Sequence, residues 1–337
     1  MFSRVIVVHA ICLSVMLFSG CSQVSSGGSH PVIRARSSKT PIRVITTTAM
    51  VTDLVRHVAG KHATVSGLMG TGVDPHLFKA TRHDIKHLYD AEIVFYSGLM
   101  LEGRMQDMLV QMNTSIHPVV AVTEQLDESF LRSPPEFKGH FDPHVWMDVD
   151  AWSLCADVVV KRLSELDPIH ADEFRQNAKD YQVELAKLHD YVKQVIASIP
   201  ASQRVLVTAH DAFGYFGRTY GIDVRSVQGV TTESEAGVQD VNRLVDFLVE
   251  RKLPAIFVES SVNQKNIQAV IEGAQSRHVT VRVGAELFSD AMGSEGTYEG
   301  TYIGMLDHNA TLIARALGGT APEAGYQGRL ALKQDAQ

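Results

Sequence analysis

Apolar and polar positions alternate along residues 41–167 in two different rhythms. Short runs rich in β-branched residues predict strands. These runs lie at 42–48, 63–68, 92–98 and 117–123. Between them, apolar residues recur at helical spacing, and these stretches lie at 50–60, 81–91 and 101–112. Strands that alternate with helices predict βαβ units, and therefore an N-terminal α/β lobe built on a parallel sheet.

The same rhythm returns in residues 201–320. Strand-like runs lie at 204–210, 224–230, 255–261 and 279–284. Helical stretches lie at 211–221, 234–253, 262–277 and 302–317. We therefore expect a C-terminal α/β lobe, again with roughly four parallel strands. The last residues, 321–337, are predicted to form a tail.

One long amphipathic stretch separates the two lobes at 168–200. Its apolar residues fall three or four positions apart, which is the spacing of one helix face. They are Phe174, Ala178, Tyr181, Leu185, Leu188, Val192, Val195 and Ile199. Pro168 stands before the start and Pro200 ends the pattern. At 1.5 Å per residue the helix would span about 45 Å, enough to run along both lobes as a single rigid linker.

The N-terminus has the pattern of an export signal. Arg4 precedes an apolar run at 5–18, which is too short for a stable transmembrane helix, so residues 1–20 are predicted to be a signal peptide. The Ser-Gly-Cys ending resembles a bacterial lipobox, in which Cys21 carries lipid, although Phe18 stands where Leu is more usual. The alternative is a cleaved signal with an incidental cysteine. Residues 21–40 are rich in Ser and Gly and predict a flexible tether. We expect a protein of the periplasm or cell surface, bound to the membrane only through this lipid anchor.

Composition narrows the class of protein. The 337 residues are 45% hydrophobic and 20% charged, so the chain can bury a substantial core. The formal net charge of −7 and the lack of a basic run argue against a nucleic-acid partner. Once the signal is removed and Cys21 is lipidated, only Cys155 remains, so no internal disulfide is expected. Cys155 lies in a helix-like run, where it is predicted to be a small buried hydrophobe.

The tripeptide Asp-Pro-His occurs twice, in "GVDPHLF" and in "GHFDPHVWMDV". Pro stiffens the loop, and the Asp can accept a hydrogen bond from nearby backbone or from an imidazole N–H. A pre-oriented neutral imidazole is what metal ligation requires. One copy alone is better explained as a structural turn. Two copies leave a turn and metal ligation by His76 and His144 about equally supported.

The C-terminal lobe offers two further candidates. His210 directly follows a strand-like run, and Asp290 lies in a loop after another. Open α/β sheets bind ligands at the carboxyl ends of their strands. Three imidazoles and one carboxylate would suit Zn²⁺, and Mn²⁺ if the Asp binds through both oxygens.

Several motifs in order resemble one family from about residue 41 to 317. They are the two Asp-Pro-His tripeptides, "TAHDAFGYF", "GAELFSDAMG", "LPAIFVESS" and "EGTYEGTYIGM". The chain is similar to the metal-binding receptors of bacterial ABC transporters, the cluster A-I or TroA-like proteins. The resemblance implies two lobes joined by one long helix, with a metal in the cleft between them. It places the ligands on His76, His144, His210 and Asp290.

The same resemblance implies the function. We expect a high-affinity extracytoplasmic receptor, not an enzyme, that binds Zn²⁺, Mn²⁺ or Fe²⁺. It would act as a monomer and deliver the ion to an ABC permease and its ATPase. Manganese receptors of the family often carry Glu where this chain has His210. Zinc receptors usually carry a long His-rich loop before the second motif, where this chain has only His140. The chain is therefore most similar to the TroA branch, which accepts both metals.

Other polar residues are candidates for smaller roles. Glu259, at the end of a predicted strand, is expected to accept an imidazole N–H from a ligand, and Glu286 is a weaker candidate for the same role. His140 is a candidate supporting residue beside the second motif. His83 and His87 stand four residues apart and could clasp a metal, although their charged neighbours favour an ordinary solvated helix face.

Two other functional classes are less well supported. A zinc hydrolase normally leaves one coordination position to water, and the chain has no H-E-x-x-H motif. A surface adhesin fits a lipid-anchored protein, but no repeat or large apolar motif supports it specifically. A Ser-His-Asp hydrolase would need a G-x-S-x-G elbow, which the sequence lacks.

Overall fold

The computed structural model describes residues 35, 40–114, 116–123 and 125–330. The predicted signal peptide, the lipidation of Cys21, most of the tether and the end of the tail therefore lie outside the described residues. Within the described part of the chain, no helix is both long enough and apolar enough to cross a bilayer.

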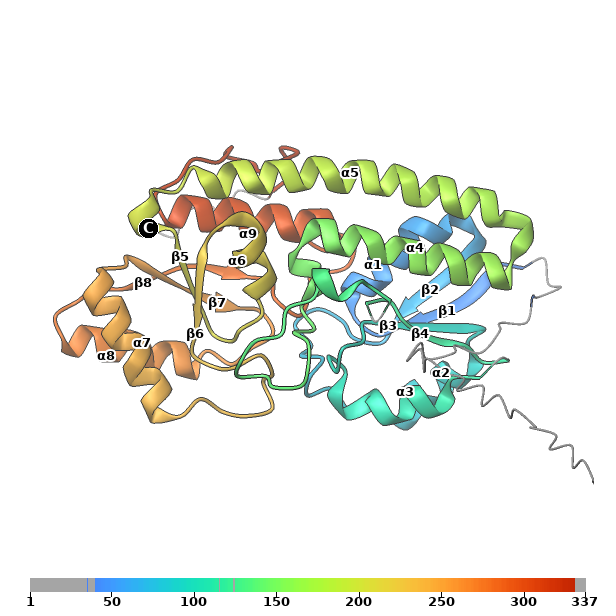
Figure 1. The fold of residues 1–337 in the computed structure, drawn as a ribbon, viewed down its shortest axis with the longest axis horizontal. Helices are drawn as coiled ribbons and strands as arrows, with labels where there is room; N and C mark the ends of the chain where they lie inside the picture. The colour runs from blue at the N-terminus through green and yellow to red at the C-terminus, as the bar shows by residue number, and fades with distance from the viewer. Residues whose placement is uncertain (1–34, 36–39, 115, 124, 331–337) are drawn as a thin grey trace, which may run out of the picture. The chain divides into compact units, whose positions relative to one another are not determined.

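The N-terminal lobe contains the predicted parallel sheet, with strand order β2-β1-β3-β4 (Figure 1). The strands are β1 (Ile42–Thr46), β2 (Ala63–Gly67), β3 (Ile93–Tyr96) and β4 (Val119–Ala121). The connecting helices are α1 (Ala49–Ala59), α2 (Arg82–Asp90) and α3 (Gln106–Met112). Every residue of the central strand β3 is buried, because its sequence is wholly apolar or aromatic. The alternating elements predicted for this lobe are confirmed.

The C-terminal lobe also has four parallel strands, arranged as two pairs, β5-β6 and β7-β8. The strands are β5 (Val205–Thr208), β6 (Asp223–Ser226), β7 (Ala255–Glu259) and β8 (Arg282–Leu287). The helices are α6 (Gly214–Tyr220), α7 (Val238–Arg251), α8 (Lys265–Ser276) and α9 (Tyr302–Ala316). Strand β8 starts later than the β-branched run at 279–284 predicts, because pairing with β7 begins only at Arg282.

The long linker helix is present as predicted. It begins with a 3₁₀ turn at Pro168–His170 and continues as α5 (Ala171–Ala197), whose 27 residues span about 40 Å. All eight predicted apolar positions are buried. In Figure 1, α5 passes α1 and α4 (Val149–Leu166) at one end and α9 at the other. The exact lobe boundaries at 167 and 201 remain predictions.

Two tyrosines of α5 attach the helix to both lobes. The Tyr181 hydroxyl donates to Oδ2 of Asp53 on α1 at 3.0 Å. The Tyr191 hydroxyl lies 2.6 Å from that of Thr311 on α9. Because the same helix is bonded to each lobe, it limits how far the lobes can separate.

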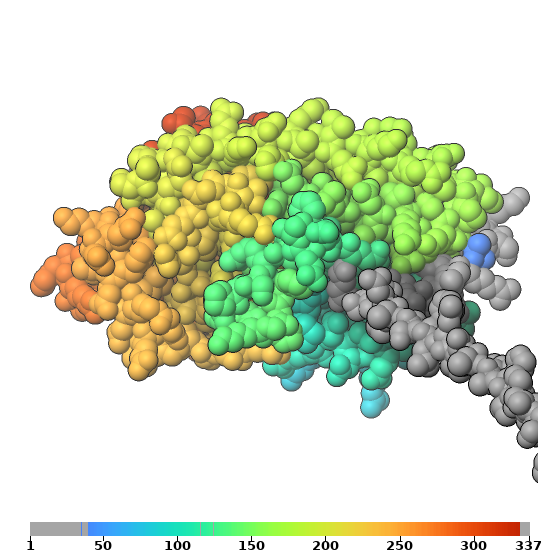
Figure 2. Space-filling model, in the orientation of Figure 1, coloured from blue at the N-terminus to red at the C-terminus, as the bar shows by residue number. Residues whose placement is uncertain are grey.

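The two lobes share one hydrophobic core. The largest cluster of buried side chains includes Trp152 from the N-terminal lobe and Phe213 and Tyr302 from the C-terminal lobe. Leu330 belongs to it as well, so the described part of the predicted tail packs back onto the protein. Figure 2 shows the green loop before α4 lying against the yellow segment of the C-terminal lobe. There Arg218 on α6 donates a 2.7 Å hydrogen bond to the carbonyl of Phe130.

Candidate metal centre

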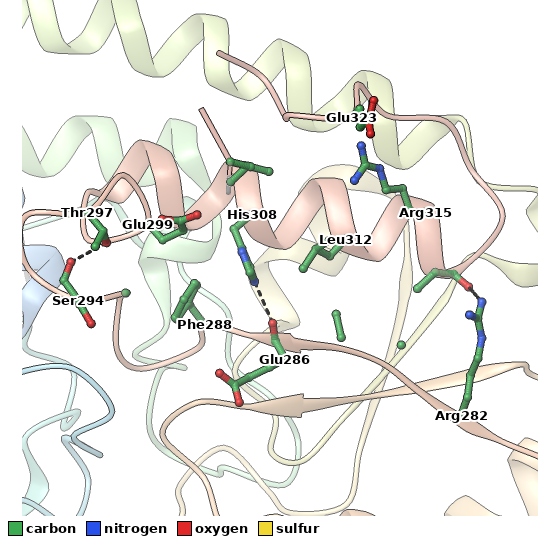
Figure 3. A pocket seen from close by; sticks show the side chains of 15 residues that line it. Arg282, Glu286, Phe288, Ser294, Thr297, Glu299, His308, Leu312, Arg315 and Glu323 are labelled. Carbon is green, nitrogen blue, oxygen red and sulfur yellow. Dashed lines mark hydrogen bonds between the residues drawn. The ribbon is translucent and has the colours of Figure 1, made fainter. Parts of the chain in front are cut away.

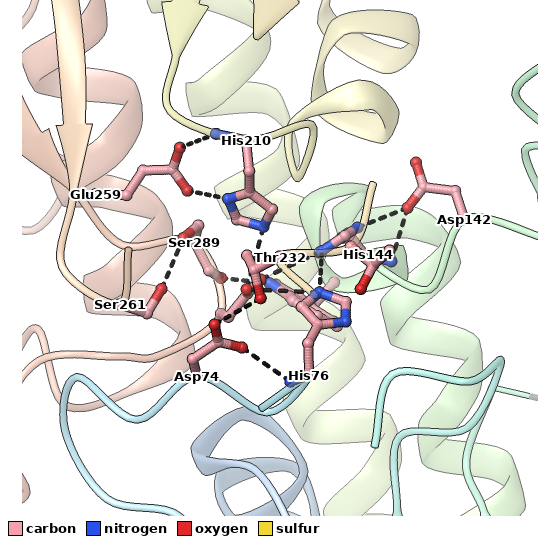
Figure 4. Close-up of polar contacts among 12 residues, drawn as sticks. Asp74, His76, Asp142, His144, His210, Thr232, Glu259, Ser261 and Ser289 are labelled. Carbon is pink, nitrogen blue, oxygen red and sulfur yellow. Dashed lines mark hydrogen bonds and ion pairs between the residues drawn. The ribbon is translucent and has the colours of Figure 1, made fainter. Parts of the chain in front are cut away.

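Four side chains from distant parts of the sequence converge inside the protein (Figure 4). They are His76, His144, His210 and Asp290, and one ligand atom from each lies within 4.8 Å of the others. Nε2 of His76 lies 3.4 Å from Nε2 of His144. Asp290 places Oδ1 3.3 Å from Nε2 of His144, and Oδ2 3.1 Å from Nε2 of His210 and 3.8 Å from Nε2 of His76. None of the four residues is more than 3% exposed.

The fold explains this convergence. His76 lies in the loop after β2, and His144 lies just before α4. His210 follows β5 by two residues, and Asp290 follows β8 by three. The loops at the carboxyl ends of parallel strands meet at one edge of each lobe. The N-terminal lobe therefore supplies two imidazoles, and the C-terminal lobe supplies an imidazole and a carboxylate.

The two Asp-Pro-His turns have the same backbone hydrogen bond. Oδ1 of Asp74 accepts from the backbone N–H of His76 at 2.9 Å. Oδ1 of Asp142 accepts from the backbone N–H of His144 at 3.0 Å. In each turn the Pro between the Asp and the His restricts the loop, so the turn presents its histidine in a defined direction.

Asp142 also fixes the ring of His144. Nδ1 of His144 lies 2.8 Å from Oδ1 of Asp142, and because a carboxylate can only accept, Nδ1–H is the donor. Asp142 forms an ion pair with Arg132, and its backbone carbonyl accepts from the Tyr215 hydroxyl at 2.8 Å. This tautomer leaves the lone pair of Nε2 facing the centre of the cluster.

Glu259 lies behind the ring of His210, in ion-pair contact with it. Its Oε2 lies 2.5 Å from Nδ1 of His210, while Oε1 accepts from the backbone N–H groups of Ala209 and His210 at 2.8 and 2.9 Å. The residue is 1% exposed at the end of β7. The structure thus places the Glu259 carboxylate where the sequence suggested it, against a candidate ligand.

The ring of His76 has a different environment. Its turn residue Asp74 directs Oδ2 to the C-terminal lobe, where it accepts from the Thr232 hydroxyl at 2.6 Å. Asp74 therefore links the first turn to the opposite lobe and does not hold the imidazole of its own motif. No sequence pattern around Thr232 or Arg132 predicts that Thr232 contacts Asp74 or that Arg132 contacts Asp142.

Asp290 is positioned through its neighbour Ser289. The carbonyl of Ser289 accepts from the indole N–H of Trp146 at 2.9 Å, and its hydroxyl lies 3.0 Å from that of Ser261. Trp146 is buried in the core, and Ser261 lies two residues after the end of β7. Both partners of Ser289 are therefore held in place by the fold. The carboxylate itself makes no ordinary hydrogen bond through either oxygen among the described residues.

The arrangement of charges in the cluster favours a bound cation. Nδ1–H of His144 donates to Asp142, Nδ1 of His210 is in ion-pair contact with Glu259, and Nε2 of both rings points at Asp290. A lone pair 3.1–3.3 Å from a carboxylate oxygen is repulsive unless a proton or a metal ion lies between them. A divalent ion at this point would satisfy all four groups at once, so the residues present fit a metal.

The pKa values of the four cluster residues are shifted by burial and by their charged neighbours. Burial alone lowers the pKa of an imidazole, and it brings the pKa of His76 to about 3. Burial also acts on His144, but the hydrogen bond to Asp142 and the nearby charge of Asp290 outweigh it and raise its pKa to about 9. For His210, the charges of Glu259 and Asp290 likewise overcome burial and raise the pKa. Burial would raise the pKa of Asp290, yet His210 and His144 hold it well below the usual range.

Other candidates lie outside the cluster. His140 is exposed and packs its ring near Phe137, with centroids 5.2 Å apart. His83 and His87 are exposed with rings 4.0 Å apart, and no third ligand joins them among the described residues. Cys155 is fully buried, as predicted, and burial raises the pKa of its thiol.

Glu286 lines a separate cavity of about 650 Å³ between β8 and α9 (Figure 3). Its backbone carbonyl faces Nε2 of His308 at 2.9 Å. Arg282, Arg315 and Glu323 line the same cavity. Glu286 therefore does not contact a candidate ligand, whereas Glu259 does.

Comparison with known proteins identifies relatives over most of the chain. The family described as "Zinc-uptake complex component A periplasmic" matches residues 44–316. The manganese-binding lipoprotein MntA of Bacillus subtilis is 44% identical over 308 residues, 91% of this chain and 97% of that protein. The zinc-binding protein TroA of Treponema pallidum is 47% identical over 274 residues, 81% of this chain and 88% of that protein. The solved structure of that periplasmic protein superposes with a TM-score of 0.79 at 46% identity, covering 82% of this chain and 99% of the other.

Proposed function

We propose a ligand set and a cargo for this protein from the premise that the chain belongs to the family of periplasmic component A proteins of zinc-uptake complexes. It is accordingly a metal-binding receptor of an ABC transporter and not an enzyme. The relatives give no support to a hydrolase or an adhesin. The proposals below concern the ligands, the ion, the anchor and the assembly.

The ligands are His76, His144, His210 and Asp290. The observation that supports this most strongly is the pair of Nε2 atoms directed at the buried Asp290 carboxylate, where a bound cation would take the place of protons. Each histidine would bind through Nε2. Asp142 and Glu259 would hold two of the rings in the required tautomer, a role typical of carboxylates behind metal-bound histidines.

The ion is Zn²⁺ or Mn²⁺, with Fe²⁺ as a further candidate. If Asp290 binds through one oxygen, the site has four ligands and suits tetrahedral Zn²⁺. Because both oxygens of Asp290 face imidazoles, a five-donor shell for Mn²⁺ is also within reach. The two relatives are named for manganese and zinc respectively, which supports the same pair of ions. Three nitrogen ligands favour tighter binding of Zn²⁺ than of Mn²⁺.

The receptor passes its ion to a permease driven by an ATPase. We propose that it does so as a monomer, anchored outside the inner membrane through lipid on Cys21, a residue outside the described structure. The relative from Bacillus subtilis is named a lipoprotein, which supports this anchor. Because α5 is bonded to both lobes, release would come from small shifts of loops and lobes rather than from wide opening.

A two-step measurement tests the proposed function. Elemental analysis of protein purified from its native host identifies the ion, and competition titration of Zn²⁺ against Mn²⁺ ranks their affinities. We expect one ion per cleft, lost in Asp290→Asn and retained in the matched control Glu286→Gln, whose carboxylate lies at a separate cavity. Unchanged affinity in Asp290→Asn would contradict the ligand set.

A further inference from the structure

A second group of metal-ligating side chains lies at the start of the linker helix. It consists of His62, His170 and Glu173, and one ligand atom from each lies within 4.8 Å of the others. His62 ends the 3₁₀ turn that precedes β2. His170 and Glu173 lie at the beginning of α5. Residues that are 111 positions apart in the chain therefore meet on one patch of the N-terminal lobe.

The ring of His170 is already oriented as a metal ligand would be. Its Nδ1 lies 2.9 Å from Oδ2 of Asp167, and since a carboxylate only accepts, Nδ1–H is the donor. Asp167 is itself buried, with 7% of its surface exposed. This is the carboxylate–histidine pairing commonly found behind metal-bound imidazoles, and it leaves Nε2 of His170 with its lone pair.

His62 is held in place by aromatic contacts. Its ring stacks on that of His170 with centroids 3.9 Å apart, and it meets Phe174 edge-on at 5.8 Å. Only 12% of its side chain is exposed. The two ring planes are only 23° from parallel, so one ring must tilt out of the stack before both Nε2 lone pairs can face one ion.

Glu173 supplies the third donor. Its Oε2 lies 2.8 Å from Nε2 of His62. Two ligands of a tetrahedral Zn²⁺ with bonds of about 2.0–2.1 Å are roughly 3.3 Å apart. The separation between His62 and the carboxylate must therefore grow by about half an ångström to admit the ion, and the Glu173 side chain is 51% exposed, which leaves it room to move.

We propose that His62, His170 and Glu173 form a second metal site, which binds Zn²⁺ through two imidazoles, one carboxylate and water. Two nitrogen donors favour Zn²⁺ over Mn²⁺ at this site. Three protein ligands at a partly exposed position bind the ion more weakly than the buried cluster in the cleft. The bound ion joins the turn before β2 to the first turn of α5, and so stabilises the attachment of the linker helix to the N-terminal lobe.

One neighbouring cation competes for this site. Nζ of Lys61 lies 3.4 Å from Oε2 of Glu173, but the lysine side chain is 80% exposed. An exposed ion pair of this kind contributes little and is readily displaced by a divalent ion. Removing the lysine charge should therefore strengthen zinc binding at this site.

The stoichiometry of zinc binding tests the proposal. The untagged full chain is titrated with Zn²⁺ in the presence of a weak chelator, and bound zinc is measured by elemental analysis after gel filtration. We expect two ions per wild-type chain, and one in His170→Ala and in Glu173→Gln. Lys61→Gln should keep two ions and bind the weaker one several-fold more tightly. With Mn²⁺ in place of Zn²⁺, binding should stop at one ion.

Two controls separate this site from the cleft and from surface histidines in general. His83→Ala removes an exposed histidine of another helix and should keep two ions. Asp290→Asn should lose the tighter ion and keep the weaker one, so failure of the cleft site is distinguishable from failure of this one. Circular dichroism checks that each variant is folded. If His170→Ala does not fold, the number of zinc ions bound by Glu173→Gln tests the proposal instead. A wild-type chain that stops at one zinc ion, or a second ion that persists in the folded variants, would overturn the proposal.

Discussion

The two Asp-Pro-His turns have the same sequence and the same backbone hydrogen bond, yet the side chains of their aspartates contact different groups. Asp142 holds the ring of His144 and is itself paired with Arg132. Asp74 instead reaches Thr232 in the opposite lobe. The two imidazoles consequently have pKa values shifted in opposite directions, to about 9 for His144 and about 3 for His76.

The comparison separates what a motif determines from what its surroundings determine. The tripeptide fixes the loop and aims the histidine, because Pro restricts the backbone and the Asp accepts from the N–H two residues later. The protonation state of the ring depends on which carboxylates lie within reach of it. One turn therefore supplies an imidazole braced by its own aspartate, and the other couples an imidazole to the opposite lobe.

The largest expected effect comes from removing either imidazole. His76→Ala and His144→Ala should each weaken zinc binding by more than the roughly 10–100-fold that is typical for loss of an outer partner. The reason is that both rings are proposed to bind the ion directly. Competition titration with a chelator of known affinity measures the change, and His83→Ala serves as the control. Wild-type affinity in either alanine variant would show that its turn is only structural.

The pH dependence of metal binding should be nearly as large. His144 holds a proton at neutral pH, since its pKa is raised from 6.5 to about 9, and an incoming ion must displace that proton. Zinc affinity should therefore rise with pH until about pH 9, by up to roughly tenfold per pH unit for each proton released. Titration at several pH values, in buffers of different ionisation enthalpy, counts the protons. A flat profile between pH 6 and 9 would contradict this.

The same shifts predict opposite effects on the stability of the metal-free protein. The raised pKa of His144 contributes stability below 6.5, which is lost as pH rises through about 9. The lowered pKa of His76 has the reverse sign: its contribution is present above 6.5 and is lost as pH falls towards about 3. Histidine ring NMR on metal-free protein checks both, and equal pKa values for the two rings would remove the contrast.

A smaller difference should separate the two aspartates. Asp142→Asn replaces the carboxylate behind His144 with a neutral amide, which is a weaker acceptor for Nδ1–H and loses the ion pair with Arg132, and it should weaken zinc binding by roughly 10–100-fold. Asp74→Asn keeps an oxygen for the backbone of His76 and should cost less than about tenfold, because no ring depends on it. The pair forms its own matched control, measured in the same competition titration. A greater loss in Asp74→Asn would reverse the assignment of roles.

Much of the fold could be predicted from periodicity. The linker helix was evident because Phe174 through Ile199 keep one apolar face over many turns, and all of these positions are buried. The start of β8 was less evident, because pairing with β7 decides it rather than β-branched content. The division of the C-terminal strands into two pairs also depends on tertiary contacts that no local pattern records.

The four residues of the cluster were easier to predict from the sequence than the residues that contact their aspartates. A repeated tripeptide and two polar residues after strands identified the four candidates that the structure brings together. Thr232 and Arg132 could not be found this way, because their partners lie 158 and 10 positions away with no shared motif. The group of His62, His170 and Glu173 has no sequence signal for the same reason, since His62 and Glu173 lie 111 positions apart.

The central claim is that four side chains from both lobes bind one ion, and anomalous diffraction from crystals grown with Zn²⁺ tests it most directly. The strongest zinc peak should lie about 2.0–2.2 Å from Nε2 of His76, His144 and His210 and from a carboxylate oxygen of Asp290. A zinc-loaded crystal with no peak among these four residues would contradict the account.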